Sequence, residues 1–419
     1  MNSKNDVQFT GYQKFVVALL AFLQFTIILD FMIMSPLGAA MMPALQMSPS
    51  QFGVVVSAYA FSAGISGILA SGFADRYDRK KLLMFFYVGF IIGTLFCALA
   101  PNYHSMLAAR IVTGLFGGVI GSVVLAITAD LFALSQRGRV MGFVQTGFAA
   151  SQVLGIPVGL YLSNIWGWHA PFFMVVAVSA LVGVIIFVYL KPIDEHLKTA
   201  PVDHNPFNHL FVTISNKKYL FAFLATALMS IGGFMLMPFG SDFTVHNIKI
   251  DLKDLPLIYL ITGIATIFIG PLVGKMSDSF GKLRTFIFGG VVSAVMVVYY
   301  TNMGPSPLIT VVIVNTIMFI GIFSRMIPSQ ALMSALPEPS NRGAFMAVSS
   351  SLQQISGGIA AVIAGFIVIK GPDGALEHFD VLGYILVGTV TITIFMMKYI
   401  NDNYVRHSPT VIKQAQPQN

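Results

Sequence analysis

Residues 71–81 read SGFADRYDRKK, and residues 274–284 read GKMSDSFGKLR. The two stretches align at an offset of 203 residues, which pairs Asp75 with Asp278. Two further pairs of segments match at nearly the same offset: RGRVMG from residue 137 with RGAFMA from residue 342, and PLG from residue 36 with PFG from residue 238. Chance seldom produces three such matches, so the sequence predicts two halves related by a parallel duplication.

The composition predicts an integral membrane protein. Of the 419 residues, 56% are hydrophobic and only 10% are charged, whereas soluble domains have roughly 25% charged residues. The 24 Lys and Arg and the 17 Asp and Glu are too few to cover a soluble body of this size. The single Cys97 excludes an intramolecular disulfide. No cleavable signal peptide is expected, because the first apolar run is too long for one.

Twelve apolar stretches are long enough to cross a bilayer as helices, which takes about 20 residues each. Their predicted limits are 15 to 42, 50 to 73, 81 to 100, 105 to 133, 140 to 163, 171 to 190, 219 to 242, 255 to 274, 284 to 302, 308 to 333, 344 to 369 and 381 to 400. The predicted fold is therefore an all-α membrane bundle of twelve helices in two pseudo-symmetric halves. We predict a six-helix half at 1–190, a cytoplasmic linker at 191–218 and a second six-helix half at 219–419.

The distribution of basic residues predicts that both termini are cytoplasmic. Of the 24 Lys and Arg, only Lys249, Lys253 and Lys370 fall in loops opposite the termini, and only Arg110 and Arg325 lie within spans. Basic residues accumulate in the cytoplasmic loops of membrane proteins. This topology accounts for the net charge of +7, so no nucleic-acid partner is inferred.

The loop between spans two and three resembles the signature G-x-x-x-D-[RK]-x-G-[RK]-x-[RK] of the major facilitator superfamily of secondary transporters. The first copy has Ser71 and Asp78 in place of the two glycines, whereas the second copy keeps both. The resemblance covers essentially the whole chain and implies two halves that rock about a central site. It also implies a cytoplasmic gate formed by Asp75, Arg76, Arg79, Lys81, Asp130, Gly274, Asp278, Gly281, Lys282 and Arg284. The alternative is that these charges only fix the orientation of the chain.

Spans four and five carry two further family patterns. Arg110 and Gly114 resemble the R-x-x-x-G pattern of the fourth helix, whose Arg is associated with proton transfer in proton-coupled members. The alternative for this Arg is that it snorkels to the surface. Span five resembles the antiporter motif of the drug and sugar efflux branch, with His169 where that branch usually has Arg. The motif residues are Gly147, Ser151, Gly155, Pro157 and Gly159. This pattern favours export by antiport.

Small residues at every fourth position predict close helix contacts. Such stripes occur in span five at the positions just given, in span eight at Thr262, Thr266, Gly270 and Gly274, in span two at Ala63, Gly67 and Ser71, and in span eleven at Gly357, Ala361 and Gly365. The resemblance implies that span five packs against span eight and span two against span eleven.

Asp30 lies in the middle of span one, within QFTIILDFMIMSPLG. A carboxylate at this depth is costly unless it is protonated, paired or hydrated, and each condition suits a residue that carries a proton. We therefore predict Asp30 and Arg110 as proton-coupling residues. The partner of Asp30 stays open between Arg110 and Arg325, and a purely structural acid is the alternative.

Polar and flexible side chains in several spans are candidates for a substrate cavity. Arg325 in span ten is a fixed cation that could hold an anionic group or pair with an acid from the other half. Asp242, at the outer end of span seven, is expected at the rim. The predicted cavity residues are Gln24, Phe31, Met34, Gln145, Gln152, Met235, Asp242, Asn315, Arg325, Gln353 and Gln354.

The sequence shows no phosphate-binding loop, metal-ligand spacing or hydrolase motif, so we expect no enzyme, no catalytic residues, no cofactor and no metal. The predicted function is proton-coupled export of amphipathic drugs or a small metabolite by alternating access. The alternatives are an uptake symporter, a carrier of an anionic substrate such as a lipid or siderophore, and a receptor that transports nothing. The expected partners are a small-molecule substrate, protons and the lipid bilayer, and the chain is expected to be a monomer in a bacterial inner membrane.

Overall fold

The computed structural model describes residues 9–70, 77–194, 197, 214–334, 336–337 and 342–405. Twelve helical segments among them are long and apolar enough to cross a membrane. This result confirms the predicted all-α membrane fold. The boundaries of the two predicted domains stay a prediction, and most of the linker lies outside the described residues.

The first half contains the helices from α1 to α9. Their bounds are α1 Gly11–Ile33, α2 Gly38–Ala44, α3 Pro49–Ala70, α4 Arg79–Ala98, α5 Tyr103–Leu131, α6 Leu134–Val144, α7 Thr146–Ala150, the π-helical turn η2 Ser151–Gly155, α8 Ile156–Trp166 and α9 Ala170–Tyr189. In this half, α5 packs against α3 and α4, and α9 packs against α1 and α4.

The second half contains the helices from α12 to α18 and a short hairpin. Their bounds are α12 Lys217–Leu236, the 3-10 turn η3 Met237–Phe239, α13 Gly240–His246, the 3-10 turn η4 Leu252–Asp254, α14 Leu255–Phe280, α15 Lys282–Thr301, α16 Leu308–Ser334, α17 Arg342–Ile367, α18 Phe379–Ile400 and the π-helical turn η5 Asn401–Val405. Strands β1 Ile369–Lys370 and β2 Leu376–Glu377 pair antiparallel before α18.

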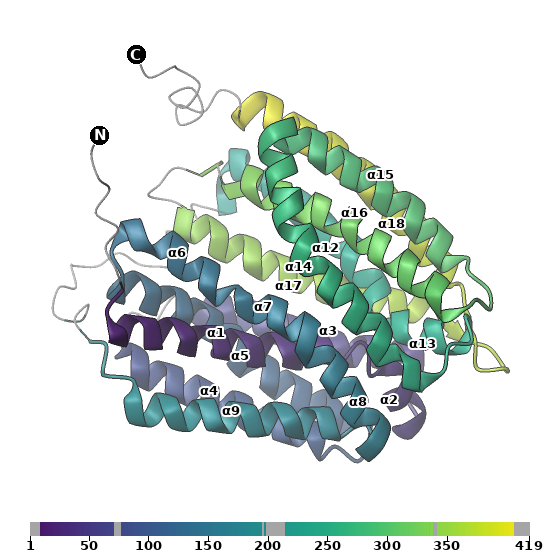
Figure 1. The fold of residues 1–419 in the computed structure, drawn as a ribbon, viewed down its shortest axis with the longest axis horizontal. Coiled ribbons are helices and arrows are strands. Elements are labelled where there is room, and N and C mark those ends of the chain that lie inside the picture. Colours follow the sequence, from purple (N-terminus) through teal and green to yellow (C-terminus); the bar gives the residue numbers. More distant parts are fainter. Residues whose placement is uncertain are drawn as a thin grey trace.

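Both α1 and α18 have their outer chain ends at one end of the bundle (Figure 1), which we call the terminal end. The other end, near α2 and α13, is the distal end. Helices α3 and α17 lie side by side and form the main contact between the halves. A Cβ on Gly53 would lie 2.5 Å from the carbonyl oxygen of Ala361, and one on Gly365 would lie 2.9 Å from that of Pro49. The predicted contact between spans two and eleven is thus present, and it is tightest at the distal end.

Proline breaks the first and seventh spans near their distal ends. The sequence predicts one helix from 15 to 42, but α1 ends at Ile33, and α2 begins after a turn that contains Pro36. In the second half, α12 gives way to the turn η3 at Pro238 before α13 begins. Proline has no N–H to donate to the preceding turn, so a continuous helix is disfavoured at both positions. The two breaks occupy matching places in the two halves.

The fifth span is also not one continuous helix, because the turn η2 precedes Pro157. The π-helical turn adds a residue to the spacing of the backbone hydrogen bonds, and Ile156 N–H bonds to the carbonyl of Ser151. The wider turn lies next to Pro157, which has no backbone N–H to donate to the preceding turn of the helix.

The fifth span packs against α14 of span eight, as the resemblance implies, but its small-residue stripe faces α1. A Cβ on Gly147 would lie 2.3 Å from the carbonyl oxygen of Ala21, and one on Gly155 would lie 2.7 Å from the side chain of Leu29. The contact with α14 instead uses Gly263, whose Cβ would lie 2.9 Å from Val153. The small residues thus hold the fifth span against α1 of its own half. The neighbouring face of the same span contacts α14 of the other half.

A layer of contacts joins the halves at the distal end, and we call it the distal seal. The hydroxyl of Ser35 donates to the carbonyl of Met237, and Ser241 donates to the carbonyl of Ser35 at 3.0 Å. The rings of Phe52 and Phe239 lie 6.2 Å apart in the same layer. In contrast, a Cβ on Gly270 or Gly274, toward the terminal end of α14, would meet nothing within 4 Å.

Candidate functional site

The buried charges Asp30 and Arg110 form an ion pair in the interior of the first half. Nη1 of Arg110 lies 2.8 Å from Oδ2 of Asp30, and both side chains are fully buried. Thr94 donates a hydrogen bond of 3.0 Å to the other carboxylate oxygen, Oδ1. Helices α1, α4 and α5 each supply one of the three side chains, so their mutual packing sets the geometry. The choice that the sequence left open for the partner of Asp30 is therefore resolved in favour of Arg110.

Tyr59 of α3 covers the other side of Arg110. The Cζ atom of the guanidinium lies 4.5 Å from the centre of the tyrosine ring. A desolvated contact of this type contributes about 2 kcal/mol. Nε and Nη2 of Arg110 are buried without a hydrogen-bond partner. The guanidinium thus points inward and depends on Asp30 and Tyr59, contrary to the alternative in which it snorkels to the surface.

Aromatic rings connect this ion pair to the second half. The rings of Tyr59 and Phe31 lie 5.2 Å apart, and those of Phe31 and Phe234 lie 5.9 Å apart. Phe31 follows Asp30 in α1, whereas Phe234 belongs to α12, so the contact between them crosses from one half to the other. A Cβ on Gly357 of α17 would lie 3.0 Å from the Phe234 ring, which packs directly on that helix. We call Tyr59, Phe31 and Phe234 the aromatic bridge.

Asp242 occupies a buried position beside the distal seal, which corrects the expectation of a rim residue. The side chain is fully buried, and Oδ1 lies 2.8 Å from Nδ1 of His246 and 3.7 Å from Nζ of Lys370. The hairpin β1–β2 brings Lys370 to this place, and Asn247 holds the hairpin through two hydrogen bonds to Leu376. Asp242 is therefore covered by the hairpin and the last turn of α13.

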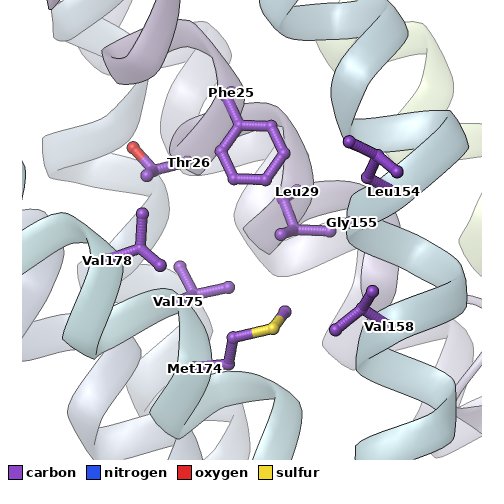
Figure 2. A pocket seen from close by; sticks show the side chains of 9 residues that line it. All are labelled: Phe25, Thr26, Leu29, Leu154, Gly155, Val158, Met174, Val175 and Val178. Carbon is purple, nitrogen blue, oxygen red and sulfur yellow. The ribbon is translucent and has the colours of Figure 1, made fainter.

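The other predicted cavity residues do not gather around one pocket in the described part of the chain. Met34 and Met235 are buried, Gln24, Gln152, Asn315 and Gln354 are half-buried, Gln145 and Gln353 are exposed, and Arg325 is buried. Asn315 donates to the carbonyl of Val311 in its own helix. A pocket of about 120 Å³ lies instead between α1, α8 and α9 (Figure 2). Its lining is almost wholly apolar: Phe25, Thr26, Leu29, Leu154, Gly155, Val158, Met174, Val175 and Val178. Because Leu154 and Val158 are exposed on the outside of the bundle, this pocket is distinct from a central site.

The predicted cytoplasmic gate is only partly within the described residues, because Asp75 and Arg76 lie outside them. Nε of Arg79 lies 2.9 Å from Oδ2 of Asp130, so these two members form an ion pair. Asp78, which replaces a glycine of the family pattern, caps α4 by accepting from the backbone N–H of Lys81 at 2.8 Å. Its second carboxylate oxygen accepts from the N–H of Ile193.

In the second copy of the gate motif, Gly281 adopts φ +96°, which favours glycine, and α15 begins at Lys282. Asp278 and Arg284 are exposed and form no ion pair within the part of the chain that the structure describes. The two copies therefore differ, with the paired charges in the first one.

Sequence reasoning missed Thr94 and Tyr59. Threonine hydroxyls in helices usually bond to their own backbone, as Thr113 does with the carbonyl of Ala109. Thr94 therefore gave no signal that separates it from such residues. A tyrosine within a span similarly resembles an ordinary apolar residue.

Twelve spans built from two related halves are typical of membrane transporters with internal repeats. The family model for the Major Facilitator Superfamily matches residues 20–361 and, in a second match, residues 222–415. The chain belongs to this superfamily, and it is a membrane transporter.

Relatives of known sequence and solved structures agree with this assignment. YceJ of Bacillus subtilis (strain 168), described as an uncharacterized MFS-type transporter, is 26% identical over 378 residues, which cover 88% of this chain and 94% of that protein. Multidrug resistance protein 2 of the same organism is 25% identical over 313 residues, 74% of this chain and 78% of that protein. The relatives are transporters and not enzymes.

Two solved structures share the fold. A mutant form of the nucleoside transporter NupG has a TM-score of 0.74 at 15% identity, covering 92% of this chain and 99% of that chain. A bacterial homolog to the human lysosomal transporter Spinster, in an inward-facing and unoccupied conformation, has a TM-score of 0.70 at 16% identity, covering 98% of this chain and 100% of that chain.

Proposed function

We propose that this protein is a proton-coupled secondary transporter that exports amphipathic compounds from the cytoplasm of a bacterium. The observation that carries the proposal is the ion pair of Asp30 and Arg110, which is fully buried and 2.8 Å long. Removing one partner of a buried ion pair typically costs about 3–5 kcal/mol. Apolar side chains of similar volume can fill the same space without a loss of stability, so packing alone does not account for the pair.

Proton uptake by Asp30 would change the balance of charge at this site. A proton on a carboxylate oxygen neutralises Asp30 and leaves Arg110 without a counter-charge. Thr94 and Arg110 can both remain hydrogen-bonded to the neutral carboxyl, but Arg110 loses the attraction of an opposite charge and keeps the ring of Tyr59 and the Asp30 carbonyl, 3.5 Å from Nη1. The free energy of the paired arrangement therefore depends on whether a proton is bound.

The aromatic bridge supplies a physical route from this change to the relative position of the halves. Arg110 contacts Tyr59, Tyr59 contacts Phe31, and Phe31 contacts Phe234 of the second half. A shift of Arg110 would alter the first of these contacts, and packed rings transmit displacement because the interior has little free volume. We propose that protonation biases the halves toward one of two arrangements, as alternating access requires.

The assignment of export rests on the antiporter pattern in span five and on relatives described as multidrug resistance proteins. Multidrug resistance protein 2 of Bacillus subtilis is one of them, and protein MdtG of Serratia proteamaculans is another, at 26% identity over 251 residues. With both termini in the cytoplasm, as proposed from the basic residues, the distal seal would close the path to the outside.

Proton release by the purified protein in nanodiscs tests the proposal. The compounds added are tetraphenylphosphonium as a cation, chloramphenicol as a neutral compound and 1-naphthoate as an anion. The unsubstituted protein should release protons when one of them binds, and Asp30→Asn should release none. Asp251→Asn is the matched control, because this acid is exposed and, among the described residues, its carboxylate pairs with the exposed Lys253 at 2.9 Å. Equal proton release by Asp30→Asn and the control would exclude Asp30 from the coupling.

Uptake is the second candidate for the direction of transport. It is favoured by the fold similarity to a protein described as a nucleoside transporter. Vesicles of one known orientation separate the two directions when a proton gradient is imposed. Accumulation of the compound on the side from which protons flow indicates antiport and hence export, whereas accumulation on the side to which protons flow indicates symport.

A further inference from the structure

Arg325 is the second intramembrane arginine, and it faces the interior of the protein. Its side chain is only 7% exposed. It shares one stripe of α16 with the buried residues Val314, Met318 and Leu332. Three exposed residues of this helix lie on another face: Ile309, Ile313 and Ile317. Ile322, at 36% exposure, marks the edge of the exposed face. Arg325 is therefore held within the second half and does not reach the bilayer.

The guanidinium of Arg325 has no acidic partner. No ion pair and no hydrogen bond of its side chain occurs within the described ranges, and Nε is buried without a partner. Nε is sealed inside the protein, whereas Nη1 and Nη2 keep access to open space. Arg110 in the first half provides the contrast, since its Nη1 contacts Asp30 at 2.8 Å.

The sequence of the second half offers no carboxylate in the middle of a span. The described acidic residues from 219 to 405 lie in loops or near helix ends: Asp242, Asp251, Asp254, Asp278, Asp373, Glu377, Asp380 and Asp402. Glu338 lies outside the described residues. A charged side chain inside a membrane needs a partner or water, and guanidinium prefers the planar, two-oxygen geometry of carboxylate or phosphate. No described acid of the second half pairs with Arg325, which leaves its terminal nitrogens available to water or to a bound anion.

We propose that Arg325 binds an anionic group, carboxylate or phosphate, on the compound that the protein transports. This inference rests on the proposed transport function and narrows its substrate class to amphipathic anions or zwitterions. The two terminal nitrogens of Arg325 donate to two oxygens of the anion, as in other pairs of this type. The substrate charge in the second half and the proton site in the first half then lie on opposite sides of the seam between α3 and α17.

Binding of matched ring compounds to the full chain in neutral-lipid nanodiscs tests this proposal. The probes share a naphthalene ring and differ in charge: 1-naphthoate and 1-naphthyl phosphate are anions, 1-naphthamide is neutral and 1-naphthylmethylamine is a cation at pH 7. The unsubstituted protein should bind at least one anion ten or more times more tightly than the neutral and cationic probes. Comparison of the two anions assigns carboxylate or phosphate as the preferred group.

Substitutions at Arg325 then test whether this residue provides the selectivity. Arg325→Gln should lower the affinity for the anion at least tenfold and leave the neutral probe unchanged. Arg325→Lys keeps the charge but not the planar guanidinium, so it should retain part of the preference for the anion. Retained binding by this variant shows that position 325 can be substituted without misfolding. Lys398→Gln, which removes an exposed cation at the end of α18, should bind like the unsubstituted protein.

Two results would overturn the proposal: no preference for either anion in the unsubstituted protein, or the same preference in Arg325→Gln. Failure of the transport hypothesis gives a different pattern. In that case anion binding still depends on Arg325, but no proton is released on binding and Asp30→Asn has no effect.

Discussion

Replacement of Gly53 by alanine should open the distal end of the protein. The Cβ of the new residue would lie 2.5 Å from the carbonyl oxygen of Ala361 and 3.3 Å from Cα of Gly365. Neither neighbouring atom belongs to a flexible side chain, so α3 and α17 must separate by roughly 0.5–1 Å to reach ordinary contact distances. Overpacking of this kind costs about 1–3 kcal/mol.

The cost applies only to the arrangement in which the distal seal is closed. If the halves separate there, the added methyl group meets no opposing backbone. A bias of about 1–3 kcal/mol corresponds to a change of 5- to 150-fold in the equilibrium between closed and open arrangements. Gly53→Ala should therefore raise the population of the distal-open arrangement by a factor in this range.

The labelling rate of a cysteine in the distal seal measures this population. Ser241→Cys places the reporter at a position that is 1% exposed, and the native Cys97 is buried and should not compete. A membrane-impermeant maleimide should label the reporter at least fivefold faster in the Gly53→Ala background. Gly388→Ala is the control, because a Cβ there meets nothing within 4 Å. Equal labelling rates in the two backgrounds, with both proteins eluting as folded, would refute the argument from helix contact.

Three further substitutions test the packing of the first half. Arg110→Gln should lower the free energy of unfolding by about 3–5 kcal/mol because it leaves Asp30 buried without its partner, and adding Asp30→Asn should recover much of that loss. Thermal or denaturant unfolding in detergent gives the coupling energy, and additive effects would contradict a shared interaction. Gly147→Val should prevent folding, since a Cβ would lie 2.3 Å from the carbonyl oxygen of Ala21. A folded, monodisperse Gly147→Val protein would show that α7 does not pack so closely on α1.

Much of the fold was predictable because a membrane imposes a simple length and polarity rule on each span. The twelve spans and their duplication follow from apolar length and from three pairs of matching segments. The breaks at Pro36 and Pro238 were not predicted, because both segments are apolar on either side of the proline. Hydropathy alone cannot distinguish one long span from a span followed by a short helix such as α2.

The partners of functional residues were harder to predict than the residues themselves. Asp30 and Arg110 stand out in the sequence because charges are rare within spans, but their contact depends on the rotation of α1 against α5. The same limitation explains the stripe that includes Gly147, since small residues mark a close contact without naming the helix that makes it. Asp242 was expected at a rim because it is near a span end, and the hairpin that covers it comes from far along the chain.

The distal seal has a consequence for how the sequence can drift during evolution. Its two cross-half hydrogen bonds run from the hydroxyls of Ser35 and Ser241 to backbone carbonyls. Every residue presents a carbonyl, so substitution of an acceptor residue does not by itself abolish the bond, and only the two small donors are chemically constrained. The distal seal can therefore persist while neighbouring side chains change. The lining of the transport path is then free to acquire new substrate specificities.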